Sequence, residues 1–245
     1  MSRIPENLQA VHARIAAAAA KVSRPAQEIS LLAVSKTFGA DAVLGAVAAG
    51  QYDFGENYLQ EALEKIEEVK RLQNNGLAGQ GTAVALLKWH FIGPIQSNKT
   101  RSLAEHFDWV HSVDREKIAQ RLAEQRPADL PPLNVCIQVN ISGETSKSGM
   151  PPGEVLGLAQ TIVALPQLRL RGLMAIPEAT ADFDAQRRPF QALHALYQRL
   201  REAGIALDTL SIGMSADLEA AIAEGATIVR VGSAIFGTRD HARAA

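Results

Sequence analysis

The sequence alternates between short apolar runs and longer stretches whose apolar residues recur at helical spacing. Short apolar runs are typical of strands buried on both faces, and residues recurring every three or four positions are typical of amphipathic helices. We predict strands over 29–35, 52–55, 89–92, 109–112, 134–139, 169–176, 209–212 and 227–231. We predict helices over 8–22, 40–49, 57–73, 97–106, 115–124, 154–164, 183–203 and 216–223.

This order of eight strand-then-helix units predicts an α/β protein with a single (β/α)8 TIM barrel and an extra N-terminal helix. Strands that alternate with helices favour a parallel sheet. The 245 residues are close to the ~250 typical of one barrel, so we expect one domain over residues 1–245. A doubly wound open sheet is the alternative fold.

Composition excludes several classes of partner. The net charge is −1 with no basic block, which argues against nucleic-acid binding. The longest apolar run, near residues 15–20, is too short to span a membrane, and no signal peptide is evident. The single cysteine, Cys136, fits a reducing compartment and is expected to be a small buried apolar residue. We therefore expect a cytoplasmic protein.

Two polar residues follow the first two predicted strands, where a barrel places its functional groups. Lys36 comes directly after the first strand, and partial burial there would favour the neutral, nucleophilic amine that imine formation requires. The alternative is a rim lysine whose amine reaches solvent. Asn57 follows the second strand and either caps the next helix or faces a ligand.

Further candidates lie after the third and fifth strands. His90 is within the third strand, where its side chain could point into the barrel, although a single histidine there is more often structural. The polar segment 140–149 is typical of a functional loop, and Lys147 is its only cation. The spacing of the six histidines matches no metal site.

The loops after the last two strands have the composition of a phosphate site. Gly213 and Gly232 let the backbone approach an anion, and Ser215 and Ser233 offer hydroxyl and amide donors at helix starts. Barrels commonly bind phosphate at these two loops. Ordinary strand-to-helix turns are the alternative interpretation.

Arg230 lies two residues before Gly232, on the same face of the strand, and is expected just below the phosphate site. A guanidinium has only donors, so it would keep a facing pyridine nitrogen unprotonated and make the ring a weaker electron sink. The alternative is a buried arginine held in a salt bridge. Together, the lysine and the phosphate site indicate a phosphorylated aldehyde, either pyridoxal 5′-phosphate (PLP) or a sugar-phosphate aldolase substrate.

Five motifs in the expected order resemble the pyridoxal phosphate homeostasis proteins. They are 31–36 (LLAVSK), 54–58 (FGENY) with Gln60 and Glu61, 89–93 (WHFIG), 211–217 (SIGMSAD) and 229–233 (VRVGS). The resemblance implies a barrel like the N-terminal domain of alanine racemase, with PLP as a Schiff base on Lys36. It further implies a phosphate held by Ser215, Gly232 and Ser233, a ring nitrogen facing Arg230, Met214 and Asn57 close to the cofactor, and Lys147 as the second lysine of cofactor exchange or a second PLP site.

The resemblance implies PLP storage, buffering or delivery in PLP homeostasis and amino-acid balance. PLP-dependent apoenzymes would then be transient recipients. Alanine racemase needs a second domain that supplies a tyrosine in trans, so we expect no efficient catalysis and a monomer. The alternative is a PLP enzyme acting on amino acids, such as a weak racemase, with His90 or Lys147 as a proton donor.

Overall fold

The computed structural model describes residues 3–74, 87–143 and 148–237. The strands are β1 (Ser30–Val34), β2 (Asp53–Glu56), β3 (Lys88–Phe91), β4 (Trp109–Val113), β5 (Leu133–Gln138), β6 (Leu168–Met174), β7 (Thr209–Ser211) and β8 (Ile228–Val231). The α-helices are α1 (Ile4–Lys21), α2 (Ala40–Val47), α3 (Leu59–Asn74), α4 (Thr100–His106), α5 (Glu116–Gln125), α6 (Val155–Val163), α7 (Phe183–Glu202), α8 (Leu218–Ala223) and α9 (Ser233–Phe236). Single 3-10 turns span Ala26–Glu28, Ser97–Lys99 and Pro152–Glu154.

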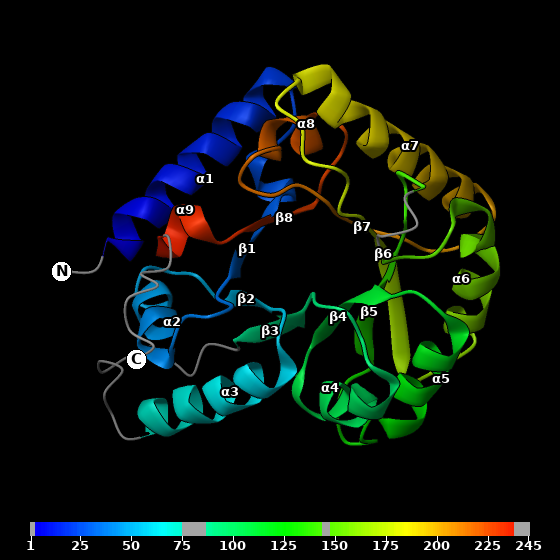
Figure 1. Ribbon diagram of the computed structural model, residues 1–245, viewed down its shortest axis with the longest axis horizontal. Coiled ribbons are helices and arrows are strands. Elements are labelled where there is room, and N and C mark those ends of the chain that lie inside the picture. Colours follow the sequence, from blue (N-terminus) through cyan, green and yellow to red (C-terminus); the bar gives the residue numbers. More distant parts are fainter. Residues whose placement is uncertain (1–2, 75–86, 144–147, 238–245) are drawn as a thin grey trace.

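Within these ranges, the eight strands form one closed barrel in chain order, and β8 pairs with β1 in parallel to complete it. The helices surround the strands as an outer ring (Figure 1). The predicted TIM barrel is therefore confirmed, and the open doubly wound sheet is wrong because β1 and β8 leave no free edge. All eight carboxyl ends consequently meet at one mouth of the barrel.

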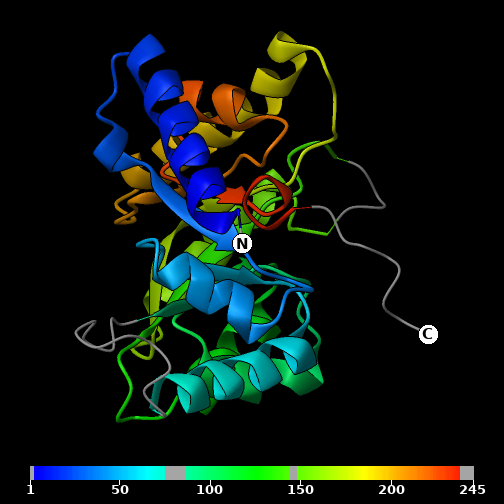
Figure 2. The same ribbon diagram turned by 90° about the vertical axis from the view of Figure 1, so that its left-hand side faces the viewer.

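Several helix boundaries differ from the predictions by a few residues, and the largest differences lie near the two ends of the described chain. Helix α1 begins at Ile4 instead of residue 8, because a proline fits in a first helical turn, where the missing N–H would have no partner. The one-turn helix α9 after β8 was not predicted. Helix α1 packs against α2, α8 and α9, as both views of the ribbon show (Figures 1 and 2). The N-terminal helix thus covers the side of the barrel where β8 meets β1.

Side chains alternate along the strands between two cores. In β1, Leu31 and Ala33 pack under the helices, whereas Leu32 and Val34 belong to a separate cluster inside the barrel. Alternation of this kind follows from the two-residue period of a strand. The inner cluster consists of Leu32, Val34, Ile92, Trp109, Cys136, Met174 and Ile228. The remaining interior space is filled by buried polar side chains from β3, β4, β7 and β8.

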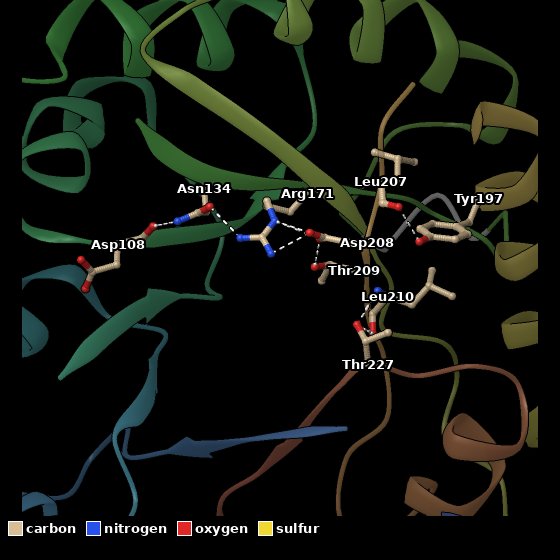
Figure 3. Close-up of polar contacts among 9 residues, drawn as sticks. All are labelled: Asp108, Asn134, Arg171, Tyr197, Leu207, Asp208, Thr209, Leu210 and Thr227. Carbon is tan, nitrogen blue, oxygen red and sulfur yellow. Dashed lines mark hydrogen bonds and ion pairs between the residues drawn. The ribbon is translucent and has the colours of Figure 1, made fainter. Parts of the chain in front are cut away.

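A network of polar side chains links neighbouring strands at the mouth formed by their amino ends (Figure 3). Arg171 donates to Asp208 at 2.8 Å and to Asn134 Oδ1 at 2.9 Å, and Asn134 donates on to the Asp108 carbonyl. The Arg171 guanidinium also lies over the Trp109 ring, 4.6 Å from its centroid. This mouth of such barrels contributes to stability more than to chemistry, and the network ties β4 through β7 together accordingly.

Cys136 is fully buried inside the barrel, which confirms its expected role as a small apolar residue. Burial raises the pKa of its thiol to about 12, so the reactive thiolate is scarce at neutral pH. We expect one thiol per chain to resist iodoacetamide at pH 8 in the folded protein and to react at an ordinary rate in guanidinium chloride. Rapid, stoichiometric alkylation under native conditions would contradict this burial.

In the part of the chain that the structure describes, no helix is long and apolar enough to cross a membrane.

Candidate functional site

A cavity of about 500 Å³ opens at the carboxyl ends of the strands. It collects side chains and backbone from the ends of β1, β2, β3, β6, β7 and β8, although these segments are far apart in sequence. Seven residues predicted to bind a cofactor all line it, namely Lys36, Asn57, Met214, Ser215, Arg230, Gly232 and Ser233. The eighth predicted residue, Lys147, lies outside the described residues.

Lys36 stands in a tight turn directly after β1. The Phe38 amide donates to the Ser35 carbonyl at 3.0 Å, and Thr37 adopts a left-handed backbone with φ of 68°. This turn carries Lys36 to the cavity rim, where its side chain is exposed. The strand ends two residues earlier, at Val34, so Lys36 stands on the turn as an exposed residue and is not in the strand end itself. Lys36 is instead distinguished by its place beside the predicted phosphate loops.

A buried lysine on α3 holds both sides of this turn. Lys65 Nζ donates to the Ser35 carbonyl at 2.7 Å, to Glu56 Oε1 at 2.7 Å and to Glu61 Oε1 at 3.1 Å. Glu61 in turn accepts from the Thr37 amide at 2.5 Å. The residues before and after Lys36 are thus both fixed by one ion-pair cluster. We call Glu56, Glu61 and Lys65 the anchor cluster.

Sequence reasoning missed the anchor cluster. Lys65 and Glu61 are four residues apart on a helix, which is also the pattern of an ordinary exposed ion pair. Only the tertiary structure shows that Lys65 is buried, with 5% of its surface exposed, and that it faces Glu56 at the end of β2. Burial raises the pKa of Glu56, while the Lys65 ammonium and the Ser35 hydroxyl oppose that shift.

Asn57 does not cap α3, because that helix begins two residues later, at Leu59. Its side-chain oxygen Oδ1 is buried and accepts no hydrogen bond from any described residue. A Cβ at Gly93 would lie 2.1 Å from the Asn57 carbonyl oxygen, so only glycine permits this close approach of the loop after β3. The arrangement leaves an unpartnered amide oxygen beside the cavity, and the ligand-facing interpretation of Asn57 is favoured.

Arg230 is buried, with 3% of its surface exposed, and forms no ion pair with a described residue. Its Nη1 donates to the Ser211 carbonyl at 2.5 Å and to Ser211 Oγ at 3.1 Å, and its Nη2 donates to the Ala175 carbonyl at 3.1 Å. Burial lowers its pKa to about 10, so the guanidinium remains charged at neutral pH. The salt-bridge alternative is therefore wrong, and no described group accepts from Nε.

The loops after β7 and β8 have the glycine geometry expected of close backbone packing. Gly213 adopts φ of +90°, and a Cβ there would lie 2.5 Å from the Ala221 side chain on α8. A Cβ at Gly232 would lie 3.1 Å from the Val34 carbonyl of β1. Ser215 and Ser233 follow these glycines and line the cavity.

Helix α1 braces both loops, which sequence reasoning also missed. Arg14 donates to the Ser215 carbonyl at 2.8 Å and pairs with Glu219 on α8 at 2.5 Å. Asn7 donates to the Ile235 carbonyl of α9 at 2.8 Å. The extra N-terminal helix therefore fixes the segments predicted to hold phosphate.

His90 is not part of this cavity. It lines a separate cavity of about 490 Å³ at the amino ends of the strands, together with Asp53 and Lys88. Its ring nitrogens face Asp53 Oδ1 at 3.1 Å and His111 Nε2 at 2.9 Å. The structure therefore does not bring His90 together with Lys36 as a proton donor. Among the described residues, no group of three or more histidine, cysteine and acidic side chains could hold a metal ion.

The assembled cavity combines the amine of an exposed lysine, two serine hydroxyls on glycine-containing loops, a guanidinium without a described ion-pair partner, and an amide oxygen. This set suits a small phosphorylated aldehyde with a ring nitrogen. The model of the family "Alanine racemase, N-terminal domain" matches residues 7–240.

Two curated relatives carry the name pyridoxal phosphate homeostasis protein. The relative from Pseudomonas aeruginosa is 59% identical over 245 residues and covers 98% of both chains. The relative from Escherichia coli K12 is 51% identical over 243 residues, covering 99% of this chain and 100% of its own. The structure of PipY from Synechococcus elongatus with PLP bound is similar at a TM-score of 0.76 and 35% identity, covering 91% of this chain and 100% of PipY. This chain therefore belongs to the pyridoxal phosphate homeostasis protein family, within the larger group of alanine racemase N-terminal domains.

Proposed function

We propose that this protein binds PLP as a Schiff base on Lys36 and acts in its intracellular storage, buffering or delivery. The observation that carries the proposal is the convergence of all seven described candidate residues on one cavity of about 500 Å³. The PLP-bound structure of PipY and the names of the curated relatives support it.

The residues present fit this cofactor. The buried Asn57 oxygen without a partner is an acceptor available to a ligand hydroxyl. The hydrogen bonds of Arg230 to described residues use Nη1 and Nη2, which leaves its Nε–H as a donor for a ring nitrogen. Ser215 and Ser233 offer hydroxyls to a phosphate. When bound, the cofactor supplies an aldehyde for imine formation and a pyridine ring that can accept electrons.

Each residue of the site has a defined part in holding the cofactor. Lys36 supplies the amine, and the anchor cluster keeps its turn in place. The serine hydroxyls and loop amides bind the phosphate, and α1 holds those loops. Arg230 keeps the ring nitrogen unprotonated because a guanidinium can only donate. The ring is then a poor electron sink, which suits retention and release better than turnover.

We infer that the protein is not an efficient amino-acid enzyme. Racemisation needs a proton donor on each face of the substrate, and among the described cavity residues only Lys36 and Arg230 are titratable. In deuterium oxide with L- or D-alanine, the PLP-loaded protein should exchange the α-proton no faster than free PLP does. Rapid exchange with interconversion of the two enantiomers would instead establish a racemase.

The remaining features are part of the same proposal. We infer one domain over residues 1–245, a monomer, a cytoplasmic location, and PLP-dependent apoenzymes as transient recipients. The single buried thiol supports a reducing compartment. Lys147 is proposed to assist cofactor exchange, and a slower transfer of PLP to an apoenzyme by Lys147→Ala, with unchanged binding at Lys36, would support that role.

Borohydride trapping tests the proposed function directly. The purified protein mixed with PLP should develop a visible imine absorbance, and reduction should add one pyridoxyl phosphate group per chain. Peptide mapping should locate the group on Lys36. Absence of the absorbance, or labelling spread over several exposed lysines, would overturn the proposal.

A further inference from the structure

Five polar side chains form an unbroken hydrogen-bonded line through the barrel interior. Asp53 Oδ1 lies 3.1 Å from His90 Nε2, and His90 Nδ1 lies 2.9 Å from His111 Nε2. His111 Nδ1 lies 2.8 Å from Ser211 Oγ, which accepts from Arg230 Nη1 at 3.1 Å. The line begins at the cavity on the amino side of the barrel and ends at the guanidinium that lines the cofactor cavity. We call these five residues the axial relay.

When both imidazoles are neutral, the Asp53 carboxylate at one end of the axial relay sets the direction of its hydrogen bonds. Arginine can only donate and a carboxylate can only accept. Arg230 therefore donates to Ser211, and Ser211 donates to His111 Nδ1. His111 Nε2–H then donates to His90 Nδ1, and His90 Nε2–H donates to Asp53. The opposite order would leave a bare imidazole nitrogen facing the Asp53 carboxylate. In this order, both neutral imidazoles carry their proton on Nε2.

The surroundings of the histidines support neutral rings. Burial lowers the pKa of His90, although Asp53 and Asp108 oppose the shift and Lys88 adds to it. Burial lowers the pKa of His111 well below its usual value, and His90 and Arg230 add to the shift. The axial relay therefore connects a carboxylate to a guanidinium through aligned neutral dipoles, in which each hydrogen bond polarises the next.

The position of this network is unusual for a barrel core. Layers of branched apolar residues commonly fill such interiors, and a buried polar group without a partner is costly. Here His90, His111, Ser211 and Arg230 are each at most 3% exposed and are all hydrogen-bonded. A network that is completely bonded holds its members in one arrangement, and so it can orient the guanidinium at its end.

We propose that Asp53, His90, His111 and Ser211 are positioning residues that fix the Arg230 guanidinium against the cofactor and transmit the Asp53 charge to it. The proposal rests on the proposed function, because Arg230 acts there on the ring nitrogen. It adds that the Asp53 carboxylate, at the opposite mouth of the barrel, changes the proton affinity of the imine of the bound cofactor. The imidazole pair lies between the Asp53 carboxylate and the Ser211 hydroxyl, so substitutions at these two residues can interrupt the coupling.

Two measurements test the axial relay. In the apoprotein, imidazole ¹⁵N shifts should show His90 and His111 as neutral Nε2–H tautomers, and Ser211→Ala should change the His111 Nδ1 shift. In the PLP-loaded protein, Asp53→Asn should lower the pH midpoint of the imine absorbance by roughly half a pH unit, because a negative charge that favours the protonated imine is removed. Asparagine retains an oxygen acceptor for His90, so the geometry is kept.

The matched control is Asp108→Asn. Asp108 lines the same mouth but accepts from the Trp89 amide at 2.8 Å instead of joining the axial relay. Its midpoint shift should be clearly smaller than that of Asp53→Asn. In a Ser211→Ala background the effect of Asp53→Asn should shrink, because the connection is interrupted. Ser211→Thr, which retains the hydroxyl, should restore it.

Equal shifts from the two aspartate variants, or full additivity of Asp53→Asn with Ser211→Ala, would reduce the effect to a general electrostatic field and overturn the proposal. An unchanged His111 shift in Ser211→Ala would also overturn it. Failure of the wild-type protein to form an imine would instead refute the proposed function, and the apoprotein spectra would still decide whether the hydrogen-bond order exists.

Discussion

Replacing Lys36 by alanine should abolish the visible imine absorbance and the borohydride-stable label. Among the described residues that line the cavity, Lys36 is the only lysine, so no neighbouring amine there can substitute for it. The phosphate loops and Arg230 remain, and we therefore expect residual noncovalent PLP binding. The affinity should fall by more than about tenfold, equivalent to ~1.4 kcal/mol, and dialysis should remove the cofactor.

Lys88→Ala is the matched control for that variant. Lys88 is also exposed, but it lies at the opposite mouth of the barrel. Its absorbance spectrum and stoichiometric label should equal those of the wild type. If Lys36→Ala kept the wild-type spectrum, or if Lys88→Ala lost it, the assignment of the Schiff base would be wrong.

Replacing Lys65 by methionine should destabilise the fold by about 3–5 kcal/mol, because it leaves the Glu56 carboxylate buried without its cation. Urea unfolding monitored by far-UV circular dichroism measures this loss. The same change releases the Ser35 carbonyl and Glu61, which hold the turn around Lys36. At near-saturating PLP, the imine on Lys36 should therefore form more slowly in the variant than in the wild type, even at temperatures where the variant is folded.

The loss of stability should depend on pH. Burial raises the pKa of Glu56 in the folded state, and without Lys65 the opposing influence of the ammonium is removed. A group with a raised folded-state pKa stabilises the fold below its unfolded pKa, and this stabilisation is lost as pH rises through the folded value. Lys65→Met should consequently be closer to wild-type stability at pH 5 than at pH 8.

Lys70→Met is the matched control on the same helix. Lys70 is exposed and pairs with Glu67 at 3.3 Å, so its removal should change stability by less than about 0.5 kcal/mol. The double variant Glu56→Gln, Lys65→Met should recover part of the loss, because no buried charge then remains. Equal destabilisation by Lys65→Met and Lys70→Met would show that the anchor cluster contributes little.

The order of elements and six of the seven cavity residues were predictable for a local reason, whereas Met214 was implied only by the family resemblance. Parallel strands buried on both faces are continuous apolar runs, and their carboxyl ends converge in a barrel. Any polar residue that follows such a run is therefore near the others. Lys36 follows β1 and Arg230 is the second-last residue of β8, and the cavity brings them together. The exposure of Lys36 was not predictable, since it depends on the turn after Val34.

The sequence alone determined the α/β barrel, the residues at its mouth and, through five motifs, the family. Tertiary structure decided which polar residues support them. Lys65 has the helical pattern of a surface lysine, and His90, His111 and Ser211 lie on three strands with no local pattern in common. Their contacts join residues as far as 100 positions apart. Such contacts arise only when the barrel closes, because periodicity reports the face on which a side chain lies and carries no information about its partner across the core.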